Sequence, residues 1–147
     1  MTSQHTNVQE YYGKLLQKSE DLKTNACTSC CKPPQTIQEI INSIHEEVTS
    51  KYYGCGLTIP TEVEGMRVLD LGSGSGRDCF ILSKLVGKNG FVVGVDMTKE
   101  QIETARKHID YHTKKFGFCK SNVEFREGYI EKLQDLNLED NSFDIIV

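Results

Sequence analysis

Apolar side chains recur every three or four positions in the first third of the chain, which is the spacing of an amphipathic helix. This pattern covers residues 8 to 22 and returns over residues 35 to 51, where isoleucines and a valine share one face and glutamates occupy the others. Pro34 suits the start of the second segment, because the first turn of a helix does not need its N–H. Residues 52 to 56 end this segment with two glycines. The sequence therefore predicts a helical arm over residues 1 to 65.

Short apolar runs replace this pattern from residue 66 onward, and helical spacing separates them. The runs cover residues 68–71, 91–95, 122–126 and 143–147, and their length is that of buried strands. Thr98 begins the helix after the second run, with Gln101 three residues later in the spacing of a capping box. Gly117 ends that helix, and residues 128–133 form a loop and short helix. Strands that alternate with helices predict a doubly wound parallel sheet, with the fourth strand beside the first.

The chain ends inside the fourth apolar run, at Ile145, Ile146 and Val147, without a turn or a polar residue to close it. In the predicted topology further strands should cover the free side of this strand, because an exposed apolar edge invites pairing with other chains. We therefore expect the 147 residues to be the N-terminal part of a longer protein or a shortened form of it.

A glycine-rich loop joins the first predicted strand to the helix that follows. Residues 70–76 have the pattern D-x-G-x-G-x-G. Glycine lets the backbone approach a ligand closely, and the helix N-terminus beyond favours negative charge or carboxylate oxygen. A dinucleotide fingerprint would place its third glycine where Arg77 stands, and the bulk of that side chain argues against it. The alternative is an ordinary turn between a strand and a helix.

The second predicted strand closes with Asp96, a position suited to a ribose. A carboxylate there can accept two hydrogen bonds from the ribose hydroxyl groups. Met97 follows and offers an apolar surface for an adenine face. The alternative is a solvated carboxylate at a strand end.

Composition narrows the class of protein. At 147 residues the chain is nominally one domain, and its net charge of −4 without a basic run makes nucleic acid an unsuitable partner. No apolar run is long enough to span a membrane, and the N-terminus has no apolar secretory segment. Six cysteines without such a segment favour a reducing compartment, where thiols serve chemistry or bind metal. We therefore expect a cytosolic protein with no membrane or nucleic-acid partner.

Four of the cysteines lie in the predicted helical arm. Cys27, Cys30 and Cys31 share a polar loop, and Cys55 lies between two glycines, a setting that favours access to a ligand. Burial as a small apolar residue is the alternative for Cys55. A second alternative is a zinc site formed by the three loop cysteines and Cys55, although a second C-x-x-C pair is missing. Cys79 is expected in the core, whereas His45 and His108 are expected on solvated helical faces.

Four segments together resemble the arsenite methyltransferase family, and the likeness extends from about residue 8 to residue 147. The segments are Tyr-Tyr-Gly-Cys-Gly at 52–56, Leu-Asp-Leu-Gly-Ser-Gly-Ser-Gly-Arg-Asp-Cys at 69–79, Gly-Val-Asp-Met-Thr at 94–98 and Gly-Tyr-Ile-Glu-Lys-Leu at 128–133. The resemblance implies an α/β, Rossmann-like class I methyltransferase fold, with a helical arm at residues 1–65 and a partial S-adenosylmethionine-binding domain at 66–147. It implies S-adenosylmethionine as the cofactor, with arsenite and methylated arsenicals as substrates.

The resemblance also implies a cofactor site. In the family pattern the acidic residue before the first glycine and the loop amides hold the methionine end of the cofactor. Tyr53 is assigned as a gate over the sulfonium because it is nearer than Tyr52 to Cys55, and packing is the alternative for both tyrosines. Residues 130 and 131 flank the adenine. The full implied set is Tyr53, Asp70, Gly72, Ser73, Gly74, Gly76, Arg77, Asp96, Met97, Ile130 and Glu131.

Cysteines are the residues that trivalent arsenic requires, because it is a soft centre that prefers thiolates. By resemblance Cys27 and Cys55 are the working thiols, with Cys55 as an arsenic ligand. A disulfide between them forms during turnover, and thioredoxin or glutathione reduces it. Two further family cysteines lie beyond Val147, so we expect the 147 residues alone not to methylate arsenite. The alternatives are another small-molecule methyltransferase with structural cysteines, and a non-catalytic fragment that binds arsenite or cofactor.

Overall fold

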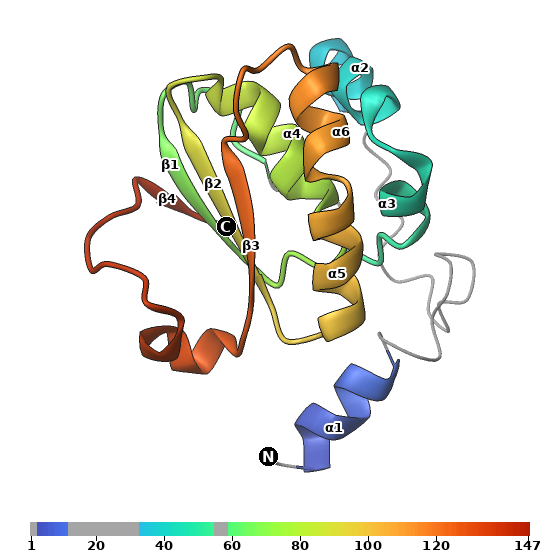
Figure 1. Ribbon diagram of the computed structural model, residues 1–147, viewed down its shortest axis with the longest axis vertical. Helices are drawn as coiled ribbons and strands as arrows, with labels where there is room; N and C mark the ends of the chain where they lie inside the picture. Colours follow the sequence, from blue (N-terminus) through green and yellow to red (C-terminus); the bar gives the residue numbers. More distant parts are fainter. Residues whose placement is uncertain (1–2, 12–32, 55–58) are drawn as a thin grey trace.

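The computed structural model describes residues 3–11, 33–54 and 59–147, and a four-stranded parallel sheet lies at its centre (Figure 1). The strands are β1 (Arg67–Leu71), β2 (Phe91–Asp96), β3 (Val123–Glu127) and β4 (Ile145–Ile146), in the order β3-β2-β1-β4. The helices are α1 (Ser3–Glu10), α2 (Gln35–Ser43), α3 (Glu46–Ser50), α4 (Arg77–Val86), α5 (Lys99–Lys107), α6 (Ile109–Lys115) and the 3₁₀ helix η3 (Ile130–Leu136). The predicted parallel sheet, with its fourth strand beside the first, is confirmed.

The two faces of the sheet carry different layers. Alternate strand residues such as Val68 and Val92, which are opposite each other in β1 and β2, face the helices α4, α5 and α2 in the larger core. Their neighbours Leu69 and Val93 face the other way, against apolar side chains of η3 and the segment after it. The helices α2 to α6 therefore gather on one side of the sheet, the 3₁₀ helix and a long connection lie on the other, and α1 lies apart, near the carboxyl ends of the strands (Figure 1).

The helices of the predicted arm differ from the prediction at two places. The first helix begins at Ser3, before the predicted start, and the rest of that segment lies outside the described residues. The helix predicted over residues 35 to 51 is confirmed over Gln35–Ser43 and Glu46–Ser50, but its continuity is wrong, because Ile44 and His45 are extended and divide it into α2 and α3. The imidazole of His45 accepts a hydrogen bond from the backbone N–H of Glu47 and so caps α3. Ile44 and Val48 stay buried across the break, which is why the apolar spacing did not reveal it.

The helix predicted after β2 is also two helices, which meet at His108. This side chain is only 5% exposed, so the expectation of a solvated histidine is wrong for it. Its ring stacks on that of His45 at 3.9 Å between centroids, and its Nε2 lies 2.8 Å from an oxygen of Glu47. Lys107 contacts the same oxygen at 2.7 Å, and Lys51 reaches the other at 3.6 Å. The cluster ties α3 to the junction of α5 and α6.

Within the part of the chain that the structure describes, no helix is long and apolar enough to cross a membrane. The division into residues 1–65 and 66–147 stays a prediction. Helices on both sides of that boundary pack together, since α2 contacts α4 and α3 contacts α5.

Replacing Glu47 by Gln tests this tie. We expect the free energy of unfolding at neutral pH to fall by about 0.5–1 kcal/mol, because partly exposed ion pairs contribute little individually. Hydrogen bonds from Lys107 and His108 lower the pKa of Glu47 from its usual 4.5 to about 2. The lowered pKa adds stability above pH 4.5 that is lost as the pH falls toward 2, so the difference from the wild type should shrink over that range.

Urea unfolding at several pH values measures this difference. The matched control is Glu46→Gln, which changes an exposed carboxylate in the same helical turn. Equal losses of stability in the two variants would contradict the conclusion that the Glu47 carboxylate holds α3 to the junction of α5 and α6.

Candidate functional site

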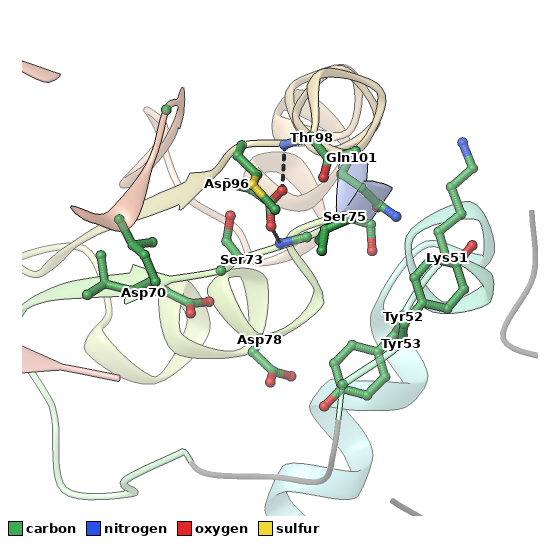
Figure 2. Close-up of a pocket in the computed structure, with 18 of the residues that line it drawn as sticks. Lys51, Tyr52, Tyr53, Asp70, Ser73, Ser75, Asp78, Asp96, Thr98 and Gln101 are labelled. Atoms are coloured by element: carbon green, nitrogen blue, oxygen red, sulfur yellow. Dashed lines mark hydrogen bonds between the residues drawn. The ribbon is translucent and has the colours of Figure 1, made fainter. Parts of the chain in front are cut away.

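A cavity of about 650 Å³ lies at the carboxyl ends of the strands (Figure 2). It is bounded by the ends of β1 and β2, the glycine-rich loop, the segment after β3, the end of α3 and the helix α1. Nine of the eleven residues assigned to a cofactor line this one space. They are Tyr53, Asp70, Gly72, Ser73, Gly74, Asp96, Met97, Ile130 and Glu131.

The glycine-rich loop is held by hydrogen bonds to β2. The backbone N–H groups of Gly72 and Ser73 both donate to the carbonyl oxygen of Val95, at 2.8 and 2.9 Å. Gly72 and Gly74 have φ values of 90° and 53°, and a Cβ at either would meet nothing within 4 Å. The amides expected to hold a ligand therefore fix the loop to the sheet, while its open side faces the cavity.

Asp96 connects this loop to the helix on the far side of the cavity. Its Oδ2 accepts from the N–H of Gly74 at 2.9 Å, and its Oδ1 accepts from the N–H of Thr98 at 2.8 Å (Figure 2). Thr98 occupies the N-cap of α5, but its side chain makes no capping hydrogen bond, so the predicted capping box is wrong. A carboxylate has about four acceptor positions, so Asp96 keeps capacity for two more donors. This remaining capacity suits the two hydroxyl groups of a ribose.

Asp70 is the most buried acidic group of the cavity, at 8% exposure. Burial raises its pKa to about 6, and the negative charges of Asp78 and Asp96 add to the rise. The thiol of Cys79 opposes this by donating to Oδ2 at 3.1 Å. Burial also raises the pKa of the Cys79 thiol, which keeps it protonated and unreactive, as a core residue should be.

The cavity wall suits a cationic ligand with hydrogen-bonding groups. Of the residues that the structure describes, Asp70, Asp78, Asp96 and Glu131 bring four carboxyl groups to it, against the one ammonium group of Lys51. Ser73 is 9% exposed, and its Oγ has no hydrogen-bond partner among the described residues. A buried hydroxyl without a partner is costly, so a polar atom of a ligand beside it would be stabilising. The donor set therefore fits a cofactor with a positive charge and a ribose.

Gly76 and Arg77 lie outside the lining. Gly76 has a φ of 87° at the N-cap of α4, and a Cβ there would come within 2.6 Å of the Phe125 ring. The guanidinium of Arg77 lies 3.9 Å from the centre of the Tyr52 ring and contacts Asp78 at 3.3 Å. Tyr52 and Asp78 both line the cavity, so Arg77 acts on it through these two neighbours, while Gly76 allows close packing against Phe125.

The assigned thiols Cys27 and Cys55 lie outside the described residues, as do Cys30 and Cys31. The structure therefore leaves both the arsenic and the zinc readings of these cysteines as predictions. Gly54, which precedes Cys55 in the sequence, lines the cavity, as does Tyr53.

A second cluster, His45, Glu47 and His108, brings three potential metal ligands within 4.8 Å of one another. Two lysines already contact the Glu47 carboxylate, and the positive charges of Lys51 and Lys107 would repel a cation. The cluster therefore serves as the tie between α3 and α5, and we assign no metal to it.

Several lining residues were missed by the sequence analysis. They include Lys51, Asp78, Thr98, Gln101 and Gly128, together with His5 and Val8 from α1. Asp78 could have been found, because it lies in the first turn of the helix that the glycine-rich loop opens. The α1 residues could not, because nothing in the local sequence indicates where an N-terminal helix docks.

Comparisons with known proteins agree with this geometry. The sequence model of a family described as a methyltransferase domain matches residues 62–147. Proteins named arsenite methyltransferase from Aquipseudomonas alcaligenes and Homo sapiens are each 54% identical, over 97% and 96% of this chain. The chain spans only 41% and 38% of their lengths.

Among solved structures, the crystal structure of an arsenic (III) S-adenosylmethionine methyltransferase from Chlamydomonas reinhardtii superposes with a TM-score of 0.76 at 47% identity. The match covers 78% of this chain and 38% of that one. This likeness confirms the predicted fold class.

Replacing Asp70 by Asn tests the charge that the cavity buries. A pKa raised from 3.8 to about 6 means that stability is fully present below pH 3.8 and is lost as the pH rises through 6. A pKa shift of this size corresponds to about 3 kcal/mol, so the free energy of unfolding of the variant should exceed that of the wild type at neutral pH by up to that amount. Thermal unfolding from acid to neutral pH measures this, with the exposed Asp110→Asn as control. If Asp70→Asn were less stable than the wild type at neutral pH, the conclusion that the buried charge of Asp70 destabilises the protein would be wrong.

Proposed function

Because the chain belongs to the methyltransferase-domain family, we propose that it forms the cofactor-binding part of an enzyme that methylates thiol-bound trivalent arsenic with S-adenosylmethionine. The observation that carries this proposal is the cavity at the carboxyl ends of the strands, where Asp70, Asp96 and the glycine-rich loop converge. The proposed substrate is inferred from the names of the relatives. The proposed arsenic-binding thiol, that of Cys55, is inferred from the resemblance of residues 52–56 to the family.

The residues of the cavity have separate tasks toward the cofactor. When bound, S-adenosylmethionine supplies a methyl group on a positively charged sulfonium. Asp70 and Asp78 make the cavity favourable for positive charge, and Ser73 offers a hydroxyl without a partner among the described residues. Asp96 accepts hydroxyl hydrogen bonds at the other end, where Met97 and Ile130 provide apolar surface.

The thiols of Cys27 and Cys55 would hold the arsenic substrate, because thiolates suit a soft centre and leave its lone pair free. Catalysis is then mainly positioning of that lone pair against the methyl donor. Methyl transfer raises arsenic formally from the trivalent to the pentavalent state. Two electrons from the two thiolates return it to the trivalent state as their disulfide forms, and thioredoxin or glutathione reduces the disulfide. Because this cycle requires a reducing compartment, we propose that the protein acts in the cytosol.

Calorimetry with S-adenosylhomocysteine tests the cofactor site on the chain itself. We expect the wild type to bind and Asp96→Ala to bind about 10- to 100-fold more weakly, because hydrogen bonds to a charged group are lost. The control is Glu127→Ala, which removes an exposed carboxylate at the end of the neighbouring strand, outside the main cavity. Equal affinities of the two variants would contradict the role of Asp96, and absence of binding by the wild type would remove the cofactor site.

The thiol assignment is tested by Cys55→Ser. We expect binding of arsenite, measured by elemental analysis after gel filtration, to fall at least about tenfold, because a hydroxyl is a poor ligand for a soft centre. Affinity for S-adenosylhomocysteine should stay unchanged. The matched control is Cys119→Ser, which removes an exposed thiol. Unchanged arsenite binding in Cys55→Ser would favour the second reading, a methyltransferase for another small molecule with structural cysteines.

A further inference from the structure

The helix α1 lies near the carboxyl ends of the strands (Figure 1), and its residues His5 and Val8 line the same cavity although they are far in the sequence from the other lining residues. The side-chain amide of Gln9 donates to the carbonyl oxygen of Met97 at 2.8 Å and to the hydroxyl of Tyr129 at 3.3 Å. His5 contacts a carboxylate oxygen of Glu131 at 2.9 Å, and its ring lies 5.1 Å from that of Tyr129. These contacts join one short helix to residues after both β2 and β3.

We propose that α1 is one wall of the nucleoside end of the cofactor site, with His5 and Val8 as binding residues and Gln9 as the residue that positions them. This inference rests on the proposed function, since the nucleoside is that of S-adenosylmethionine. His5 and Val8 line the cavity together with Met97, Ile130 and Glu131, and all five belong to the end where Asp96 closes β2.

The apolar surface at this end favours the proposal. Val8 is 38% exposed and Ile130 is 53% exposed, and both line the cavity. Exposed apolar side chains from two separate segments that face one space gain stability when a flat apolar group covers them both. A purine ring has that shape, and the carboxylate of Asp96 nearby accounts for the ribose attached to it.

The length of α1 also favours the proposal. It has eight residues, and isolated helices of this length are marginal in water, so its conformation depends on what it packs against. The polar contacts of His5 and Gln9 hold it at the rim of the cavity, and a ligand beneath it would add further contact. Coupling of this kind is reciprocal, so a ligand that α1 contacts must in turn stabilise α1.

In this proposal α1 contacts the nucleoside of the cofactor and not its amino-acid part. The carboxyl groups of Asp70 and Asp78 lie on β1 and at the start of α4, whereas the side chains of His5 and Gln9 contact residues after β2 and β3. A change in α1 should therefore weaken a nucleoside that lacks the amino-acid part as much as it weakens the whole ligand.

Calorimetry with S-adenosylhomocysteine and with 5′-methylthioadenosine tests this on the full chain. We expect Gln9→Ala and Val8→Ser to weaken both ligands about three- to tenfold, the effect of one hydrogen bond or a partly buried apolar group. Val8→Ile, which keeps the apolar surface, should bind as the wild type does. The matched control is Asn7→Ala, because Asn7 is an exposed residue of the same helix that does not line the cavity.

Hydrogen exchange provides a readout that does not depend on substitutions. Saturation with S-adenosylhomocysteine should increase the protection of the amides of residues 7–11 by at least about threefold. Unchanged protection, or equal affinities of Gln9→Ala, Val8→Ser and Asn7→Ala, would overturn the role of α1. If the wild type still binds S-adenosylhomocysteine in that case, the proposed function stands. A wild type that binds neither ligand would overturn both. Thermal unfolding without ligand identifies any variant whose weak binding comes from a loss of folded protein.

Discussion

The carboxylate of Asp96 is the interaction on which the shape of the site depends. It accepts one backbone N–H from the loop after β1 and another from the start of α5, and so joins two segments that leave neighbouring strands in different directions. The loop is further fixed by two hydrogen bonds to Val95, and by the hydroxyl of Ser75, which donates to the carbonyl of Val48 in α3. Because these bonds are made within the protein, the cavity is formed before a ligand arrives.

Charge is the second constraint, and it opposes stability. A buried carboxylate such as Asp70 is costly when ionised, because the interior solvates charge poorly. The hydrogen bond from Cys79 and the limited exposure to the cavity offset only part of this, since the pKa of Asp70 remains raised to about 6. A cationic ligand would supply the missing opposite charge. Groups that destabilise a free protein in this way are common at functional sites, where they are matched to the ligand.

The helices outside the sheet determine which residues close the site. The cluster of Glu47, His45 and His108 ties α3 to α5, and the end of α3 then places Tyr52 and Tyr53 at the cavity. Helix α1 brings His5 and Val8 to the opposite end through Gln9. The carboxyl ends of the strands thus form one side of the site, and two segments from the first 54 residues of the chain close it at opposite ends.

The sequence was enough to predict the order of strands and helices, the loop with its three glycines, and the role of Asp70 and Asp96, which both line the cavity. It could do so because apolar spacing and glycine positions are local properties of a parallel sheet, whose carboxyl ends meet at one edge. The breaks at Ile44–His45 and at His108 escaped it, since a helix broken between two buried positions keeps its apolar face. Four features became visible only in the folded chain: His108 is buried, the loop amides bond to the sheet, Arg77 does not line the cavity, and α1 does. These depend on contacts between residues up to 120 positions apart, and no local pattern encodes which partner a side chain will meet.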